Sequence, residues 1–280
     1  MRRHARLFAT ATRFVLIEHG RNRFAIVLVV LFLPAWTTLA YLAMPAGRAR
    51  MQLQATGQWL TPHGNELTAV SGALNAVTLI TGFLMFAATF NSGSFDKRLA
   101  LAGFPRPHLV AAKTTGLAVA SALVAAYATA VTCLTWSPRR PVLLMAALFC
   151  AALTYGILGI GFGSLLRREV EGMFAIVMTS IIDLALQNPV TSSGADSPGL
   201  RLLPSYGAMQ AATAAGFSTE AVPGCLVIQL AWFTAAAAAG LLAFRYRTRT
   251  ALPAHARSLP APRQDTDGER HPAQSRGTPR

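Results

Sequence analysis

Residues 91–113 read NSGSFDKRLALAGFPRPHLVAAK and separate two long apolar runs. Ser92 or Ser94 can cap the start of a helix, and Asp96 in its first turn suits the positive end of the helix dipole. Gly103 can close that helix in the left-handed conformation, and the prolines after it prevent a straight continuation into the next run. The stretch therefore predicts a short charged helix between two membrane spans.

The composition places the chain in a membrane. Of its 280 residues, 53% are hydrophobic and only 13% are charged. About 20 consecutive apolar residues cross the hydrocarbon layer as a helix with every backbone group satisfied internally. We therefore expect an all-α integral membrane protein with six transmembrane helices, at roughly 24–44, 67–90, 109–134, 141–164, 171–187 and 222–244.

The positive charges predict the orientation. With the N-terminus in the cytoplasm, 20 of the 25 Lys and Arg residues fall on the inner side and 5 on the outer side. Cytoplasmic loops carry an excess of Lys and Arg, so we expect both termini to be cytoplasmic. The formal charge of +14 does not indicate nucleic-acid binding, because the basic residues lie at membrane edges rather than on a folded polar face.

Three divisions of the chain follow from these patterns. Residues 1–20 form an amphipathic stretch with Leu7, Phe8, Ala11, Phe14 and Val15 on one helical face, which predicts an interfacial helix. Residues 21–245 hold the six predicted spans. Residues 246–280 are basic and rich in Pro, Ser and Gln with almost no large apolar residue, which predicts a disordered cytoplasmic tail.

The predicted outer side carries two long loops. Residues 45–66 are expected to form a polar loop. In the second loop, 188–221, Ser205 can cap a short helix that runs to about Phe217 and is too short to span a membrane. We expect this helix to lie outside, before the sixth span.

Polar side chains within the apolar runs are candidates for a substrate pathway, because hydrocarbon offers them no partners. The second and fifth spans supply most of them, and the alternative is that they only bond neighbouring helices. Asp183, a carboxylate well inside an apolar run, either faces a cavity or bonds loop backbone. The candidate pathway residues are Asn75, Thr78, Thr81, Gly82, Phe86, Met178, Thr179 and Asp183.

Motifs for catalysis or metal binding do not occur in the sequence. There is no GxxxxGK[ST] phosphate loop, no HExxH and no GxSxG, so the sequence predicts neither an enzyme nor an ATP-hydrolysing unit of the common type. Cys133, Cys150 and Cys225 lack the spacing of a metal site or a disulfide framework. We expect no catalytic residue, no metal and no cofactor on this chain.

The order of these elements resembles the permease subunits of ABC-2 type ABC transporters. In that family an amphipathic helix precedes six spans, and the loop before the third span carries a coupling helix that contacts the ATPase. A short external helix precedes the sixth span. The residues that match the coupling loop are Asp96, Lys97, Arg98, Leu99, Leu101, Gly103, Phe104, Pro105 and Arg106.

The resemblance implies a separate ATPase subunit that binds ATP and Mg²⁺, and a second permease subunit in a homodimer or heterodimer. It implies a bacterial plasma-membrane exporter of hydrophobic or amphiphilic molecules such as antibiotics or drugs. An ion-coupled secondary transporter, a membrane-embedded enzyme, and a non-transporting anchor or immunity protein are the alternatives. The first of these needs ionisable residues near the midplane of the membrane, and Asp183 is the one candidate in the sequence.

Overall fold

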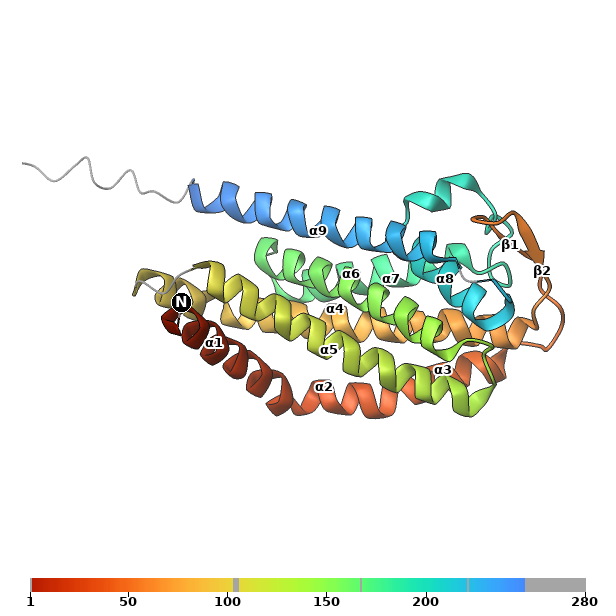
Figure 1. The fold of residues 1–280 in the computed structure, drawn as a ribbon, viewed down its shortest axis with the longest axis horizontal. Helices are drawn as coiled ribbons and strands as arrows, with labels where there is room; N and C mark the ends of the chain where they lie inside the picture. The colour runs from red at the N-terminus through yellow and green to blue at the C-terminus, as the bar shows by residue number, and fades with distance from the viewer. Residues whose placement is uncertain (1, 103–105, 167, 221, 250–280) are drawn as a thin grey trace, which may run out of the picture.

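The computed structural model describes residues 2–102, 106–166, 168–220 and 222–249. The chain forms an elongated helical bundle (Figure 1). Its elements, in order, are α1 (Arg2–Arg21), α2 (Arg23–Val27), a π-helical turn (Leu28–Phe32), α3 (Leu33–Ala43), β1 (Met51–Leu53), β2 (Gln58–Leu60), α4 (Gly64–Leu101), α5 (Arg106–Thr135), α6 (Pro141–Leu165), α7 (Glu169–Gln187), a 3-10 turn (Pro198–Leu202), α8 (Tyr206–Phe217) and α9 (Pro223–Arg249).

Among the described residues, five segments are long and apolar enough to cross a membrane, which indicates a membrane protein. They are Arg23–Ala43, Gly64–Gly93, His108–Thr135, Pro141–Leu165 and Pro223–Leu242. The expected fifth span is α7, a helix of 19 residues that carries two glutamates in its first turn and Asp183 near its end. It is not among these five, so its passage through the membrane stays a prediction.

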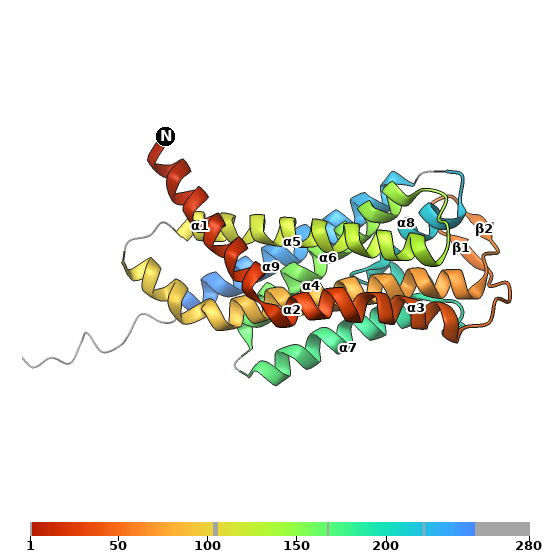
Figure 2. The same ribbon diagram turned by 90° about the horizontal axis from the view of Figure 1, so that it is seen from below.

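The two ends of the bundle differ. The β-hairpin and α8 lie at one end, called here the hairpin end, and the start of α1 lies at the other, called the α1 end (Figures 1 and 2). The last turns of α4, the start of α5 and the end of α9 also lie at the α1 end. Successive long helices therefore run back and forth between the two ends.

The core of the bundle is the packing of α4 against α6. α4 is the most buried of the five candidate spans. A Cβ at Gly159 of α6 would lie 2.3 Å from the carbonyl oxygen of Gly82, and one at Gly163 would lie 2.9 Å from that of Phe86. Small residues four apart thus let the two backbones approach closely.

The first span changes its hydrogen-bond pattern just before Pro34. In an α-helical register the N–H of residue 34 would bond the carbonyl of Val30, and proline has no N–H. A π-helical turn over Leu28–Phe32 precedes the proline. The hydroxyl of Tyr127 on α5 donates to the Val30 oxygen at 3.2 Å, so the carbonyl freed by the proline has a partner.

The region 45–66, expected to be a polar loop, contains a β-hairpin. β1 and β2 pair antiparallel with Met51 opposite Leu60 and Leu53 opposite Gln58. Gly57 takes a φ of 70° in the connecting turn, a conformation that glycine adopts without strain. Met51 and Leu53 are buried. The alternating pattern of MQLQ and the Gly before QWL is the signal for this hairpin, which we did not predict.

Candidate functional site

A buried carboxylate at the hairpin end of α7 organises a polar network. Asp183 Oδ2 accepts hydrogen bonds from the Tyr155 hydroxyl at 2.5 Å and from the backbone N–H of Ser205 at 3.0 Å. Asp183 Oδ1 accepts from Gln187 Nε2 at 2.6 Å. Only 1% of Asp183 is exposed. Three donors from α6, α7 and the segment before α8 thus offset the cost of burying this carboxylate.

Gln229 on α9 holds the start of α8 from the other side. Its Nε2 donates to Thr154 Oγ1 at 2.8 Å and to the carbonyl of Pro204 at 2.7 Å. Its Oε1 accepts from the backbone N–H of Ala208 at 2.9 Å. Asp183 and Gln229 together tie the first turn of α8 to α6, α7 and α9.

The helix α8 has the predicted bounds but lacks the predicted cap. No side-chain cap bond forms at Ser205; its Oγ instead accepts from Gln187 Nε2 at 2.9 Å. Every residue of Tyr206–Gly216 is buried, with α8 packed against α6 and α9. Its small side chains let neighbouring helices enclose it, and its location on the outer side of a membrane stays a prediction.

A second polar cluster joins α4 to α7. Asn75 Nδ2 donates to Ser180 Oγ at 2.9 Å, and the hydroxyls of Thr78 and Ser180 are 2.7 Å apart. Asn188, just after α7, donates to Ser71 Oγ at 2.9 Å. These pairs connect residues about a hundred positions apart and fix the rotation of α7 against α4.

The other candidate pathway residues lie along the same contacts. Thr81 bonds the carbonyl of Val77 at 2.7 Å. Gly82 faces Ile176, whose Cγ2 would be 2.8 Å from an added Cβ. Met178 and Thr179 are half-buried on α7.

Phe86 is fully buried, and its ring lies against the Cα of Gly172, where an added Cβ would overlap it. Every one of the candidate pathway residues contacts another helix of the same chain or is at least half-buried. A route at an interface between two chains stays a prediction.

The predicted coupling segment continues α4 instead of forming a helix of its own. α4 runs unbroken to Leu101, so the expectation of a separate helix starting at Ser92 or Ser94 is wrong. The Lys, Arg, Leu and Ala residues that follow favour helix, and a helix that is already formed needs no new cap. Ser92 Oγ accepts from Lys113 Nζ on α5 at 3.0 Å.

The remaining matches to the coupling loop are partly described. The backbones of Asp96, Lys97, Leu99 and Leu101 belong to α4, that of Arg106 begins α5, and Arg98 is exposed. Gly103, Phe104 and Pro105 lie outside the described residues, and so does the predicted tail from residue 250 on.

The amphipathic helix α1 packs against α5. Val15 fits against Gly116, where an added Cβ would lie 2.5 Å from Val15 Cγ1. His19 Nδ1 donates to the carbonyl of Val15 at 2.9 Å, and its Nε2 is 3.4 Å from Met85 Sδ. Leu7, Phe8 and Ala11 are half-buried, while Phe14 is 67% exposed. The predicted apolar face is thus the packed face, with Phe14 as its exception.

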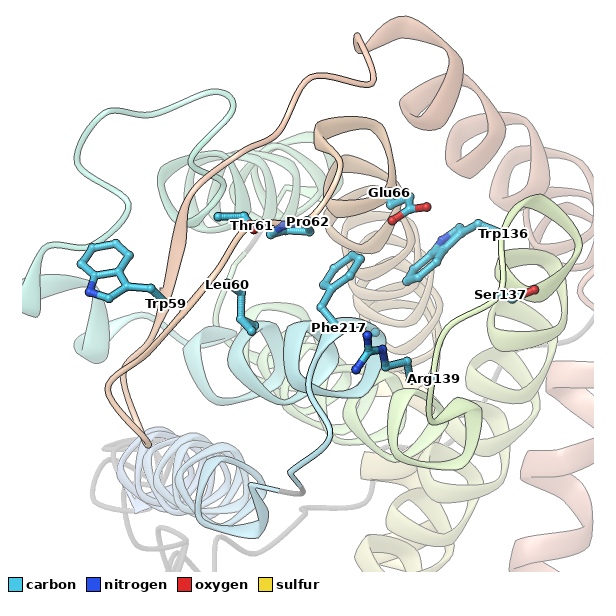
Figure 3. Close-up of a pocket in the computed structure, with 10 residues that line it drawn as sticks. Trp59, Leu60, Thr61, Pro62, Glu66, Trp136, Ser137, Arg139 and Phe217 are labelled. Atoms are coloured by element: carbon cyan, nitrogen blue, oxygen red, sulfur yellow. The ribbon is translucent and has the colours of Figure 1, made fainter.

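A hollow of about 400 Å³ opens at the hairpin end. Its walls come from β2, the start of α4, the α5–α6 link and the end of α8 (Figure 3). The lining side chains include Trp59, Glu66, Trp136, Arg139 and Phe217. Sequence reasoning missed this hollow because its walls are far apart along the chain and the hairpin was not expected.

Metal and disulfide chemistry find no support in the described part of the chain. Among those residues no group of three His, Cys, Asp or Glu side chains could hold a metal ion. Cys133, Cys150 and Cys225 are free thiols.

Comparisons with known proteins do not assign the chain to a family. No protein-family model matches the sequence, and none of the curated proteins matches it. The resemblance to ABC-2 permeases therefore rests on the order of the elements and on the residues of the α4–α5 connection.

Proposed function

We propose that this chain is the permease subunit of an ABC-2 type ABC transporter. It exports a hydrophobic or amphiphilic small molecule such as an antibiotic or drug, powered by a separate ATPase that binds ATP and Mg²⁺. The observation that carries the proposal is the position of α1, which lies at the same end of the bundle as the α4–α5 connection (Figure 1). An interfacial helix and a basic connection at one end form a surface that a cytoplasmic ATPase subunit can contact.

Contacts between α1, α4 and α5 support this role. Lys113 of α5 bonds Ser92 of α4, and α1 packs along α5 with His19 reaching Met85 of α4. In this proposal a movement at the end of α4 reaches α5 through the Ser92–Lys113 contact and reaches α1 through its packing on α5. In this proposal both termini are cytoplasmic and the membrane is a bacterial plasma membrane.

The exposed helix faces support a second subunit and a lipid environment. α9 and the first span are the least buried candidate spans. Large apolar side chains are exposed on both, among them Leu31, Leu39, Val227 and Leu242. Contiguous apolar surface of this kind is expected against lipid or against another permease subunit, as a homodimer or heterodimer.

The Asp183 network weighs against an ion-coupled secondary transporter. The coupling-ion sites of such transporters lie near the midplane of the membrane, whereas Asp183 lies close to the C-terminal end of α7. Both oxygens of Asp183 already accept hydrogen bonds from Tyr155, Ser205 and Gln187. The geometry therefore favours anchoring of α8 over ion exchange.

Two measurements test the proposal. An ATPase encoded beside this chain should co-purify with it, and proteoliposomes holding both should transport substrate with ATP but not with an ion gradient alone. Reversing Lys97 and Arg98 to Glu should reduce co-purification and substrate-stimulated ATP hydrolysis about tenfold or more, since two favourable charges become repulsive.

The matched control is Arg168→Glu, a charge reversal on the α6–α7 link. Arg168 is exposed and lies 3.7 Å from Glu171, and this variant should leave ATPase binding unchanged. If the Lys97/Arg98 variant keeps normal ATPase binding and stimulated hydrolysis, the α4–α5 connection is not the contact. A wild-type chain that transports on an ion gradient without ATP would overturn the proposed function.

A further inference from the structure

The hollow at the hairpin end is lined by a carboxylate, Glu66, and by aromatic rings. Glu66 belongs to the first turn of α4 and makes no ion pair within the described residues. Trp136 Nε1 is buried and has no hydrogen-bond partner there. Figure 3 shows Glu66 beside Trp136, both on the wall of the hollow. A carboxylate and an indole N–H without partners in one hollow favour a polar ligand.

The frame of this hollow is fixed by the chain itself. The backbone N–H groups of Arg139 and Arg140 donate to the carbonyls of Gly216 at 3.3 Å and Ala215 at 2.9 Å. The rings of Trp136 and Phe217 stack with centroids 5.1 Å apart. A Cβ at Gly216 would lie 2.8 Å from Trp136 Cη2. The aromatic wall is therefore held in place before any ligand binds.

Charges of both signs surround the hollow. Arg139 lines it beside Phe217 (Figure 3), and the guanidinium carbon of Arg50 lies 4.1 Å from the centre of the Trp59 ring. A simple cation would be attracted by Glu66 and repelled by Arg139. A simple anion would be attracted by Arg139 and repelled by Glu66. A ligand with an ammonium group and an anionic group satisfies both, with the ammonium held by Glu66 and aromatic faces.

The position of the hollow suggests where such a ligand comes from. It is lined by residues next to the ends of three candidate spans, which begin at Gly64, end at Thr135 and begin at Pro141. Span ends lie at the headgroup level of a bilayer, where Trp side chains also gather. The volume of about 400 Å³ falls within the size range of small-molecule sites.

We propose that the hollow binds a zwitterion that joins an ammonium to a phosphate, the chemistry of a phosphatidylethanolamine or phosphatidylcholine headgroup. Glu66 holds the ammonium against the rings of Trp136 and Phe217. Arg139 holds the phosphate. This site does not depend on the ATPase, so it can be tested independently of the proposed function.

The test uses the full chain purified in a detergent without charged headgroups. Calorimetry with phosphoethanolamine should show saturable binding, at least tenfold tighter than with ethanolamine alone or inorganic phosphate alone. Glu66→Gln should weaken it by about tenfold to a hundredfold, because the ammonium then meets a neutral amide oxygen in place of a carboxylate. Glu18→Gln, an exposed glutamate on α1, is the matched control and should have no effect.

Two further arms complete the test. Arg139→Gln should reduce phosphoethanolamine binding to the level of ethanolamine, and because Arg139 is exposed this variant serves if Glu66→Gln fails to fold. Native mass spectrometry with phosphatidylethanolamine and phosphatidylglycerol tests the lipid source. Retention of the zwitterionic lipid alone, lost in Glu66→Gln, identifies a headgroup site even if the free zwitterion binds weakly.

The outcomes that overturn the proposal are equally definite. The proposal is wrong if neither phosphoethanolamine nor the zwitterionic lipid binds saturably to the wild-type chain. It is also wrong if the Glu66→Gln and Glu18→Gln variants bind these ligands equally well. A wild-type chain that binds neither ligand but still co-purifies with its ATPase would refute this site and leave the proposed function standing.

Discussion

Replacing Asp183 by Ala tests whether the buried carboxylate anchors α8. The change removes the acceptor of three donors, but Gln187 Nε2 keeps bonds to Ser205 Oγ at 2.9 Å and to the Asp183 carbonyl at 3.2 Å. The Tyr155 hydroxyl and the Ser205 N–H lose their main partner. An orphaned buried donor costs about 1–3 kcal/mol, so with two such donors the free energy of unfolding should fall by about 2–6 kcal/mol.

Asp183→Asn should cost much less, about 1 kcal/mol, by the same reasoning. The Asn oxygen can still accept from Tyr155 or Ser205. Gln187 Oε1 is buried without a partner within the described residues, so a flip of the Gln187 amide lets this oxygen accept from the Asn amide. The order of stabilities should therefore be wild type, then Asp183→Asn, then Asp183→Ala.

The assay is reversible unfolding in bicelles, with Asp196→Ala as the control. Asp196 is exposed and accepts from the backbone N–H of Gln52 at 3.3 Å, so its loss should cost less than about 0.5 kcal/mol. A double-mutant cycle with Tyr155→Phe should give a coupling energy above about 1 kcal/mol. An Asp183→Ala variant as stable as the control would refute the anchoring role.

Three smaller predictions follow from other contacts. Gly159→Ala should lower the unfolding midpoint by several degrees, since overpacking against the Gly82 carbonyl costs roughly 1–3 kcal/mol, while Gly161→Ala, with nothing within 4 Å of its Cβ, should not; equal midpoints would contradict the close packing. Burial lowers the pKa of His19 below 6.5, against smaller opposing effects of the Val15 carbonyl and Glu18, so stability present above pH 6.5 should be lost as pH falls below it. Unfolding midpoints at pH 7.5 and pH 5 should differ in wild type and differ less in His19→Gln. Truncation after Thr250 should leave expression and transport near normal, and a severe loss would show that the tail contacts a partner.

Much of the fold could be predicted because the apolar composition of a membrane span extends over about 20 consecutive residues. Runs of about 20 apolar residues located the five candidate spans, with small shifts at their ends. The bounds of α8 were also predictable, since polar and turn residues flank it on both sides. The hairpin was missed because its strands are three residues each, too short for alternation to stand out.

The end of α4 was mispredicted for a physical reason. Ser92, Ser94 and Asp96 are typical of a helix start, and they were interpreted as one. In a segment where a helix is already running, adding a residue costs less than nucleating a new helix. Local capping signals therefore do not mark a boundary unless something also ends the preceding helix, and α4 continues through all three residues to Leu101.

The site depended on pairings that a single sequence does not reveal. Asp183 and Asn75 stood out because hydrocarbon offers them no partner, but their partners Tyr155, Ser180 and Ser205 are ordinary residues of spans and loops. Which of many hydroxyls would face Asp183 depends on the rotation and height of α6 and α7. Gln229 was overlooked although an amide in an apolar run is the same kind of signal.

The polar residues of the second and fifth apolar runs have one physical explanation in this fold. A membrane helix with a carboxylate or an amide must find donors and acceptors on other helices, and α4, α6, α7 and α9 satisfy one another at the hairpin half of the bundle. At the other half, α7 meets α4 through Phe86 against Gly172, an apolar contact without directional bonds. Hydrogen bonds fix one geometry, whereas an apolar contact tolerates sliding, so any movement of α7 relative to α4 costs least at the α1 end. That is also the end where the proposed ATPase contact lies.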